Sequence, residues 1–439
     1  MKVMKFGGTS VGSAERFKNV ARLLLDRGRN IVVLSAMSGT TNSLVEIADY
    51  LYKRNSAGAQ EMITSLENKY SGVVNALFET HEAREKARKE LKGCFSYLRS
   101  FVREQFGENE EKEILSQGEL MSTILMANYL RELGVDVVLL PALDFMRTDE
   151  NAEPDIPYIE KRLLPMLEEH AEAPMFITQG YICRNCRGDV DNLQRGGSDL
   201  TASLIGAVTG AEEIEIWTDI DGMHNSDPRY VANTQPVHEL HFEEAAELAY
   251  FGAKILHPTC VLPAKVNNIP VRLLNTMQPE AAGTLISNFP PSRTIKAIAA
   301  KDNITAIKIK SSRMLLSYGF MSQVFEVFER YRIPIDMVAT SEVGVSLTID
   351  NRRDFDRIIN ELKVFATVST DDDMVIICVV GDLEWHNTGF EAKVVEALRG
   401  IPVRMISYGG SNYNISLLVK KENKIEALNA LHKKLFIDK

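Results

Sequence analysis

Two glycine turns in the N-terminal part of the sequence carry side chains that could bind phosphate and an acidic substrate. The first, Lys5-Phe6-Gly7-Gly8-Thr9-Ser10, follows a short apolar pattern and leads through Ser13 into a helical pattern. Glycines let backbone N–H groups approach a ligand, a helix N-terminus attracts an anion, and a lysine can neutralise a transferring phosphoryl group. The spacing matches neither GxGxxG nor GxxxxGK[ST]. These residues indicate either a phosphate site of another type or a plain turn.

The second turn, Arg195-Gly196-Gly197-Ser198-Asp199-Leu200-Thr201, also opens an apolar helical pattern. Arg195 could clamp a carboxylate through its guanidinium and Ser198 could donate to the same group. Asp199, in the first helical turn, could orient an ammonium group. Together these groups suit an amino acid substrate. The alternative is that Asp199 only caps a helix and Arg195 is a surface charge.

Two further segments could contact a nucleotide. Trp217-Thr218-Asp219-Ile220-Asp221-Gly222, followed by Ser226-Asp227-Pro228-Arg229, comes directly after a strand pattern, and ligands of α/β proteins bind at the carboxyl ends of strands. Plain Asp-Gly and Asp-Pro turns would explain Asp221 and Pro228 but not Arg229. Lys254 stands at a predicted helix end before a proline, where a cation favours the helix dipole and could also reach phosphates.

The elements that must position these residues alternate along the first ~290 residues. Predicted strands are Lys2–Phe6, Asn30–Ser35, Val135–Leu140, Met175–Gln179, Glu213–Thr218 and Ile269–Leu273. Predicted helices are Ala14–Arg27, Ser43–Arg54, Gly118–Leu133, Leu200–Thr209 and Phe242–Phe251. This alternation predicts an α/β fold with a mainly parallel, helix-covered sheet. The charge-rich residues 60–112 predict a pair of helices on the flank of that domain.

The rest of the chain follows an apparent boundary at Phe289-Pro290-Pro291-Ser292 and contains a repeat. Gly319-Phe320 recurs as Gly389-Phe390, each opening an apolar helical pattern, and Val345-Ser346-Leu347 recurs as Ile415-Ser416-Leu417. Each copy reads strand, helix, strand, strand, helix. Two tandem α+β modules with open sheet edges predict a ligand site at a module or subunit interface.

Composition excludes several classes of protein. The chain has 439 residues, of which 45% are hydrophobic and 25% charged, as in globular proteins of several domains. A net charge of −10 gives no global field for nucleic acid, and the apolar runs are too short to span a membrane. Five cysteines predict a reducing cytoplasm. Cys183 and Cys186 form a C-x-x-C pair, but a zinc site needs four ligands, so we predict no metal site there.

Six motifs in order resemble the aspartokinases of the amino acid kinase family. They are KFGGTSV (5–11), LSAMSGTTN (34–42), SQGE (116–119), RGGSDLTA (195–202), WTDIDG with DPR (217–229) and ELAYFGAKILHP (247–258). The resemblance covers the whole chain. It implies a three-layer kinase sandwich with a mainly parallel central sheet over 1–292, followed by two α+β, ferredoxin-like ACT regulatory modules at 293–371 and 372–439.

The resemblance also implies an activity and its residues. ATP would phosphorylate the side-chain carboxylate of L-aspartate to give 4-phospho-L-aspartate and ADP, the first step of a pathway to lysine, threonine and methionine. Lys5 and Lys254 would stabilise the γ-phosphate, and Asp199 would hold them in register. Aspartate would be bound by Ser35, Thr41, Glu119, Arg195 and Ser198. ATP would be bound by Lys5, Gly7, Gly8, Thr218, Asp219, Arg229 and Lys254. Mg²⁺ would sit chiefly on the phosphates.

The first repeat resembles that of lysine-sensitive aspartokinases, which implies feedback inhibition by L-lysine bound across a homodimer or a higher oligomer formed through the ACT modules. The implied lysine site comprises Met314, Ser317, Phe320, Met321, Ile335, Asp336, Thr340 and Ser341, with Asp336 facing the ligand ammonium. The alternative is that Met314, Phe320 and Met337 are core residues. Threonine is the second candidate effector.

The sequence departs from the family pattern at His224, where a tyrosine is common, and at 189–194, where threonines and glycine are usual. These departures put nucleotide and aspartate affinity in question. Two rival functions stay open at this point. One is an amino acid kinase acting on glutamate, acetylglutamate or carbamate, and the other is a non-catalytic amino acid sensor. A sensor is expected to lack a reactive lysine or Asp199, yet both are present.

Overall fold

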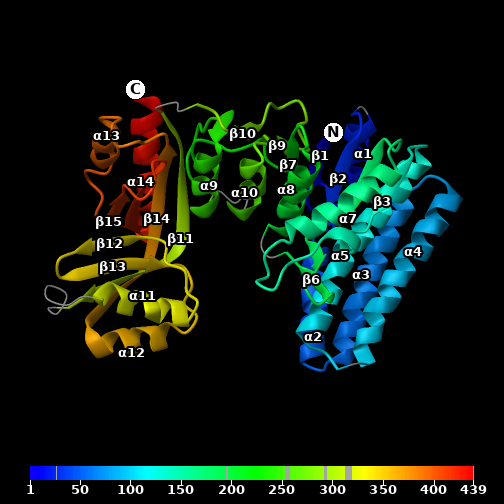
Figure 1. The fold of residues 1–439 in the computed structure, drawn as a ribbon, viewed down its shortest axis with the longest axis horizontal. Helices are drawn as coiled ribbons and strands as arrows, with labels where there is room; N and C mark the ends of the chain where they lie inside the picture. The colour runs from blue at the N-terminus through cyan, green and yellow to red at the C-terminus, as the bar shows by residue number, and fades with distance from the viewer. Residues whose placement is uncertain are drawn as a thin grey trace. The chain divides into compact units, whose positions relative to one another are not determined.

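The computed structural model describes residues 1–25, 27–103, 105–193, 196–252, 258–290, 294–311 and 319–438. The chain divides into two compact units. Figure 1 shows the fold, with the chain coloured by residue number. One comprises Met1–Met223 with Ile255–Asn288, and the other comprises His224–Lys254 with Phe289–Lys439. The second unit therefore receives a short segment from within the kinase-like part of the sequence. Among the described residues, no helix is long and apolar enough to cross a bilayer.

A mainly parallel sheet forms the centre of the first unit. Its strands lie in the order β3 (Val137–Leu140), β4 (Met175–Gln179), β2 (Asn30–Leu34), β1 (Lys2–Phe6), β7 (Ile214–Thr218), β9 (Val271–Asn275) and β10 (Thr284–Ser287). Each neighbouring pair from β3 to β9 is parallel, and β10 runs antiparallel to β9. The predicted α/β fold is confirmed, and the six predicted strands are all present. A hairpin of β5 (Ile182–Arg184) and β6 (Val190–Asn192) follows β4.

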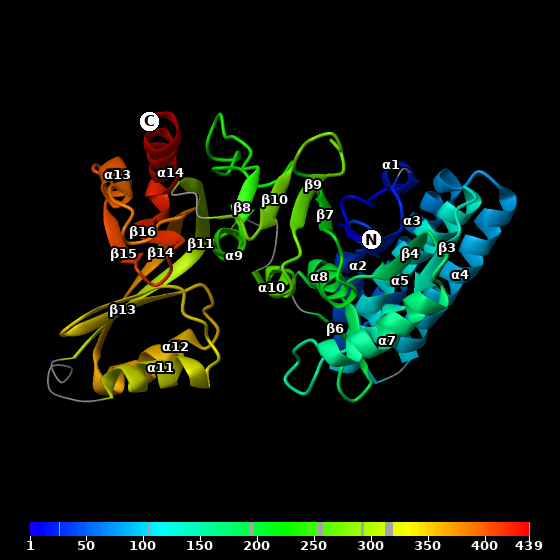
Figure 2. The same ribbon diagram turned by 45° about the horizontal axis from the view of Figure 1, so that its top comes forward.

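Helices cover both faces of this sheet (Figures 1 and 2). They are α1 (Ala14–Leu25), α2 (Thr40–Tyr52), α3 (Ser56–Leu77), α4 (His81–Ser100), α5 (Glu108–Glu132), α6 (Ala142–Phe145), α7 (Ile156–Glu169), α8 (Gly197–Thr209) and α10 (Pro258–Val266). Met4 and Phe6 of β1 join one apolar core with side chains of α1 to α5. The opposite face of β1 packs against α8, because side chains alternate along a strand.

Local signals explain where several helices begin. Ser13 accepts a hydrogen bond from the Arg16 amide at 3.3 Å, and Thr80 accepts one from the Ala83 amide at 3.3 Å, so both cap free N–H groups. The helix pair predicted within residues 60–112 corresponds to α3 and α4. Helix α5 begins at Glu108, ten residues before the predicted start at Gly118, and α7 was not predicted.

The second unit contains an antiparallel sheet whose helices belong to two separate apolar cores. Its strand order is β12 (Val338–Ser341), β13 (Gly344–Ile349), β11 (Ile295–Lys310), β14 (Thr367–Gly381), β16 (Asn414–Lys420) and β15 (Val403–Tyr408). Its helices are α11 (Phe320–Arg330), α12 (Phe355–Phe365), α13 (Phe390–Ala397) and α14 (Lys424–His432). The segment from the kinase-like part adds β8 (Glu239–His241) and α9 (Phe242–Tyr250).

The internal repeat predicted from the sequence is confirmed in these elements. The first copy reads β11, α11, β12, β13, α12, and the second reads β14, α13, β15, β16, α14. Gly319 and Gly389 cap the corresponding helices with φ of 87° and 96°, a conformation that favours glycine. The two repeats do not form separate sheets, because residues 295–301 of β11 pair with residues 376–381 of β14. Each repeat thus contributes a strand segment that pairs within the sheet of the other.

Candidate active site

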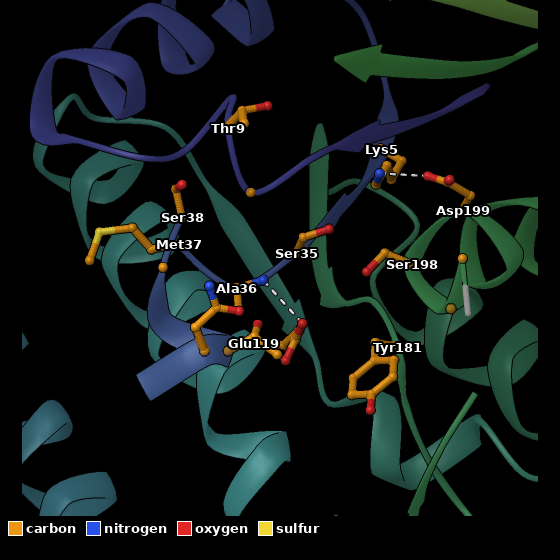
Figure 3. A pocket seen from close by; sticks show the side chains of 16 residues that line it. Lys5, Thr9, Ser35, Ala36, Met37, Ser38, Glu119, Tyr181, Ser198 and Asp199 are labelled. Carbon is orange, nitrogen blue, oxygen red and sulfur yellow. Dashed lines mark hydrogen bonds and ion pairs between the residues drawn. The ribbon is translucent and has the colours of Figure 1, made fainter. Parts of the chain in front are cut away.

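A cavity of about 640 Å³ opens beside the carboxyl ends of β1 and β2 in the first unit. This is the sheet edge at which α/β proteins bind ligands. Figure 3 shows the cavity from close by. Its lining consists of Lys5, Gly8, Thr9, Ser35, Ala36, Met37, Ser38, Gly39, Thr41, Asn42, Glu119, Tyr181, Gly196, Gly197, Ser198 and Asp199. The first two glycine turns predicted to carry chemistry therefore meet in one place.

Lys5 and Asp199 form an ion pair at one end of the cavity. The Nζ atom of Lys5 lies 2.5 Å from Oδ1 of Asp199, and each side chain is 12% exposed. Lys5 points toward α8 because its neighbours Met4 and Phe6 face the opposite core. Asp199 lies in the first turn of α8, where the helix dipole favours an anion. The pair holds the Lys5 ammonium next to a helix N-terminus, and both groups can bind a phosphate.

Gly8 lets two ligand-binding loops approach each other. A Cβ atom at Gly8 would lie 2.7 Å from the carbonyl oxygen of Ala36, closer than real contacts allow. The Gly8 carbonyl accepts a hydrogen bond from the Ser38 amide at 3.1 Å. The Gly7 amide donates to the Trp217 carbonyl at 3.1 Å, so it is already used within the protein. Of the two glycines in this turn, Gly8 lines the cavity and Gly7 does not.

Glu119 presents a carboxylate from α5 to another part of the cavity. The residue is 5% exposed, and its Oε1 accepts a hydrogen bond from the Ala36 amide at 3.1 Å. Its Oε2 is buried and has no hydrogen-bond partner in the described structure. Burial raises the pKa of Glu119 to about 8, although the Ala36 hydrogen bond opposes this rise. An ammonium group bound here would supply the missing partner and favour the ionised carboxylate.

The two ends of the cavity carry different charged groups. Figure 3 shows Lys5 and Asp199 at one end, Glu119 and Tyr181 at the other, and Ser35 and Ser198 between them. One end can therefore attract a phosphate and the other an ammonium group, while hydroxyl groups between them can bind a carboxylate. Thr41, which is also expected to bind aspartate, lies in the cavity lining.

Of the residues expected to bind nucleotide, Lys5 and Gly8 line this cavity, whereas Gly7, Thr218, Asp219 and Arg229 do not. Thr218 ends β7, and its hydroxyl donates to Oδ1 of Asp219 at 3.1 Å. Arg229 belongs to the second unit, where its Nη2 lies 2.6 Å from Oδ2 of Asp227. His224 shares a 2.9 Å hydrogen bond with Thr234. Arg195 and Lys254, both predicted site residues, lie outside the described part of the chain.

The residues expected to bind an effector gather in the second unit. Phe320 is buried in the core of the first repeat, as the alternative interpretation expected, and Met321 and Ile335 pack against that core. Asp336 has a fully buried side chain whose Oδ1 lies 2.6 Å from Nζ of Lys301. Thr340 and Ser341 lie on β12. Met314 and Ser317 are outside the described residues.

The C-x-x-C pair and the unusual segment before RGGSD belong to the β5–β6 hairpin. Cys183 is buried and Cys186 is exposed, and both are free thiols. Within the described ranges, no three His, Cys, Asp or Glu side chains gather to hold a metal ion. Asp191 forms an ion pair with Lys112 at 3.1 Å. One of the two acidic residues in the segment, Asp191, thus has a structural contact with α5.

Tyr181 is the cavity residue that the sequence analysis missed. It follows β4 by two positions in Gln179-Gly180-Tyr181, and the other residues of this short loop carry no charge. The available signal was its position at the carboxyl end of a parallel strand. The remaining lining residues fall within motifs that the sequence analysis quoted.

Comparisons with known proteins agree with this geometry. The profile of the amino acid kinase family matches residues 1–275, more than half of the chain, and an ACT domain profile matches 377–435. Lysine-sensitive aspartokinase 3 of Escherichia coli is 34% identical, with 99% of each chain covered. This chain belongs to the aspartokinases of the amino acid kinase family. Chloroplastic aspartokinase 3 of Arabidopsis thaliana is 37% identical over 99% of this chain and 81% of that relative.

Solved aspartokinase structures have the same fold. The crystal structure of E. coli aspartokinase III in complex with aspartate and ADP (R-state) matches with a TM-score of 0.86 and 33% identity, covering 99% of this chain and 100% of that one. The complex of the same enzyme with lysine and aspartate (T-state) matches with a TM-score of 0.79, covering 99% of each chain. The family assignment and the α/β fold followed by ACT modules, both predicted from the sequence, are confirmed.

Proposed function

We propose that this aspartokinase transfers the γ-phosphate of ATP to the side-chain carboxylate of L-aspartate, giving 4-phospho-L-aspartate and ADP. The observation that carries the proposal is the polarity of the cavity, with Lys5 at one end and the buried Glu119 at the other. An amino acid whose ammonium group meets Glu119 can direct a second carboxylate toward Lys5. The names of the relatives and the aspartate- and ADP-bound structure of E. coli aspartokinase III support this choice of substrate.

Positioning and charge neutralisation carry the reaction. A carboxylate is ionised at neutral pH, so the attacking oxygen needs no general base. Lys5 neutralises charge that develops on the transferring phosphoryl group, and Asp199 holds the Lys5 ammonium in place. Ser35 and Ser198 hold the attacking carboxylate between the two ends of the cavity. Arg195 binds the α-carboxylate and Lys254 joins Lys5 at the phosphate, as the family motifs imply.

ATP approaches the Lys5 end of the cavity. As the family motifs imply, Thr218, Asp219 and Arg229 contact the nucleotide, and Gly8, in the loop after β1, lies in the cavity lining where the phosphates would bind. Mg²⁺ is held mainly by the phosphates and supplies further positive charge when bound. The positive Lys5 side chain beside the N-terminus of α8 supports binding of a triphosphate at this end.

A coupled assay for ADP release tests the activity. Purified protein with MgATP is offered L-aspartate, L-glutamate, N-acetylglutamate or carbamate at equal concentrations. We expect ADP release with aspartate and little with the other three acids. Activity on another acid alone would favour the rival amino acid kinases, and activity on none would favour a non-catalytic sensor.

The second unit supports feedback regulation by L-lysine. Oδ1 of Asp336 pairs with Nζ of Lys301 at 2.6 Å, and its buried Oδ2 has no hydrogen-bond partner among the described residues, so Oδ2 could accept from the ammonium group of a ligand. The lysine site comprises this residue with Met314, Ser317, Phe320, Met321, Ile335, Thr340 and Ser341. Titration with L-lysine tests the proposal, with L-threonine as the comparison. Unchanged activity at millimolar lysine would exclude it.

Strands β12 and β15 form the two edges of the sheet in the second unit, and edges of this kind can pair with another copy. We therefore place a homodimer contact at the ACT modules, with modules at 293–371 and 372–439 following a kinase domain at 1–292. Light scattering during size-exclusion chromatography measures the oligomeric state. Five free cysteines suit a reducing cytoplasm, where the product would enter amino acid biosynthesis toward lysine.

A further inference from the structure

Tyr181 has a backbone conformation that large side chains rarely adopt. Its φ is +69°, in the left-handed region. This conformation costs a non-glycine residue about 1 to 2 kcal/mol, and it persists only where neighbouring contacts impose it. Such residues concentrate at ligand sites, and Tyr181 lines the candidate active site. The contacts that hold Tyr181 therefore indicate what its side chain does.

Hydrogen bonds from two directions hold the Tyr181 backbone. Its amide donates to Oγ1 of Thr201 on α8 at 3.1 Å, and its carbonyl accepts from the Leu193 amide at 2.7 Å. Thr201 is itself fixed, because its hydroxyl also donates to the Gly197 carbonyl at 2.9 Å. The peptide groups on both sides of Tyr181 are thus tied to helix α8 and to the segment that follows β6.

Two glycines interlock this loop with the start of α8. A Cβ atom at Gly197 would lie 2.6 Å from Cδ2 of Tyr181, so the aromatic ring packs directly over the Gly197 backbone. A Cβ atom at Gly180 would lie 2.5 Å from Cβ of Ser198. Because the ring already touches the Gly197 backbone, it has no space to move further toward α8. Contact with Gly197 and the backbone hydrogen bonds thus fix Tyr181 on the α8 side of the cavity wall.

The ring lies at the amino acid end of the cavity. Figure 3 shows it beside Glu119, with Ser198 between it and the Lys5–Asp199 pair and its hydroxyl directed away from Lys5. Burial, with the nearby Glu119 and Asp191 carboxylates, raises the pKa of Tyr181 to about 12, so the ring is neutral at physiological pH. A neutral, fixed aromatic surface can limit the length of a substrate without attracting its charges.

We propose that the Tyr181 ring sets the length of acidic amino acid that the cavity accepts, and so favours aspartate over glutamate. This inference rests on the proposed function. The reacting carboxylate must stay at the phosphate near Lys5, so the extra methylene of glutamate pushes its amino end toward Glu119 and the ring. The ring occupies that space. Tyr181 is a positioning residue that determines specificity, because it takes no part in the phosphoryl transfer.

Kinetics of Tyr181→Gly and Tyr181→Phe test the inference. One methylene in an apolar pocket changes kcat/KM by about 10- to 200-fold, so Tyr181→Gly should lower the aspartate-to-glutamate ratio of kcat/KM by about tenfold or more. Most of the loss should come from a higher KM for aspartate and a gain in activity on glutamate, with the KM for ATP unchanged. Glycine also adopts the positive φ without strain, which protects the fold.

Tyr181→Phe is the matched control, because it keeps the ring and removes only the hydroxyl. It should retain the wild-type ratio. The inference is wrong if folded Tyr181→Gly keeps the wild-type ratio, or if Tyr181→Phe loses as much discrimination as Tyr181→Gly. A wild-type protein that phosphorylates neither acid would overturn the proposed function, whereas an aspartate-active wild type with an unaltered Tyr181→Gly ratio overturns this inference alone. Thermal melting of each variant establishes that it is folded.

Discussion

The ammonium group of Lys5 lies 2.5 Å from the carboxylate of Asp199, although the two residues are far apart in the sequence. Strand β1 supplies the lysine and helix α8 supplies the aspartate, and both side chains are nearly buried. The pair fixes a positive charge where the γ-phosphate is expected. Its two members should therefore contribute to the rate of transfer more than to substrate affinity.

We expect Lys5→Met to lower kcat by about 10²- to 10³-fold, as loss of one transition-state charge contact does in other enzymes. The KM for aspartate should change little, because Glu119 and the serines still bind it. Steady-state ADP release measures both parameters. Lys2→Met is the control on the same strand, since Lys2 pairs with Glu215 at 2.8 Å and does not line the cavity. Unchanged kcat in Lys5→Met would show that Lys5 is not catalytic.

Glu119 should make aspartate binding depend on pH. Its pKa of about 8 in the folded protein lies above its ordinary value of 4.5, so free enzyme at pH 6 holds a neutral carboxyl group there. Aspartate needs the ionised form, because only that form pairs with the substrate ammonium. We therefore expect kcat/KM for aspartate to rise with pH through about 8, while kcat for the bound complex varies less.

The raised pKa of Glu119 also makes the stability of the fold depend on pH. Stability should fall as pH rises, whereas kcat/KM should rise. The stabilising contribution from protonated Glu119 is fully present below about 4.5 and is lost as pH rises through about 8. Glu119→Gln is uncharged at every pH, so it should flatten both the kcat/KM profile and this part of the stability profile. The two profiles are measured by initial rates and by thermal melting without ligand. A Glu119→Gln profile that keeps the inflection would assign it to another group.

Lys301 should be required for stability of the second unit. Its ammonium lies 2.6 Å from Asp336, which has no exposed side-chain surface, and 2.9 Å from the partly exposed Asp350. Burial raises the pKa of Asp336 while Lys301 opposes that rise. Lys301→Met leaves the buried carboxylate without its counter-ion, so we expect a loss of about 3 kcal/mol in the free energy of unfolding.

Asp350→Asn is the control for this prediction, because it removes the more exposed partner of the same lysine. Its cost should stay below about 1 kcal/mol. Urea unfolding of the full chain, followed by circular dichroism, compares the two variants. The double variant Lys301→Met with Asp336→Asn should recover part of the loss, since no buried charge then remains. Equal costs for the two single variants would contradict the assigned role of burial.

Much of the local structure could be read from the sequence. Short apolar runs predicted the six parallel strands of the central sheet but not β10, and Ser13 marked the start of α1. Gly319 and Gly389 marked equivalent helix starts in the two repeats because both need a positive φ. Motif order identified the family and most residues that line the cavity. These features depend on residues close in the sequence or on patterns shared with relatives.

Only the tertiary structure decided how distant segments combine. It showed that β11 and β14, one from each repeat, pair with each other along their length. It also showed that the Gly7 amide is already bonded and that Tyr181 belongs to the cavity wall. The pKa of Glu119 was equally inaccessible, because it depends on how much water neighbouring elements exclude from one carboxylate. The sequence determined which groups are present and which local structures carry them. Long-range packing determined their solvation, their partners and the space left for a substrate.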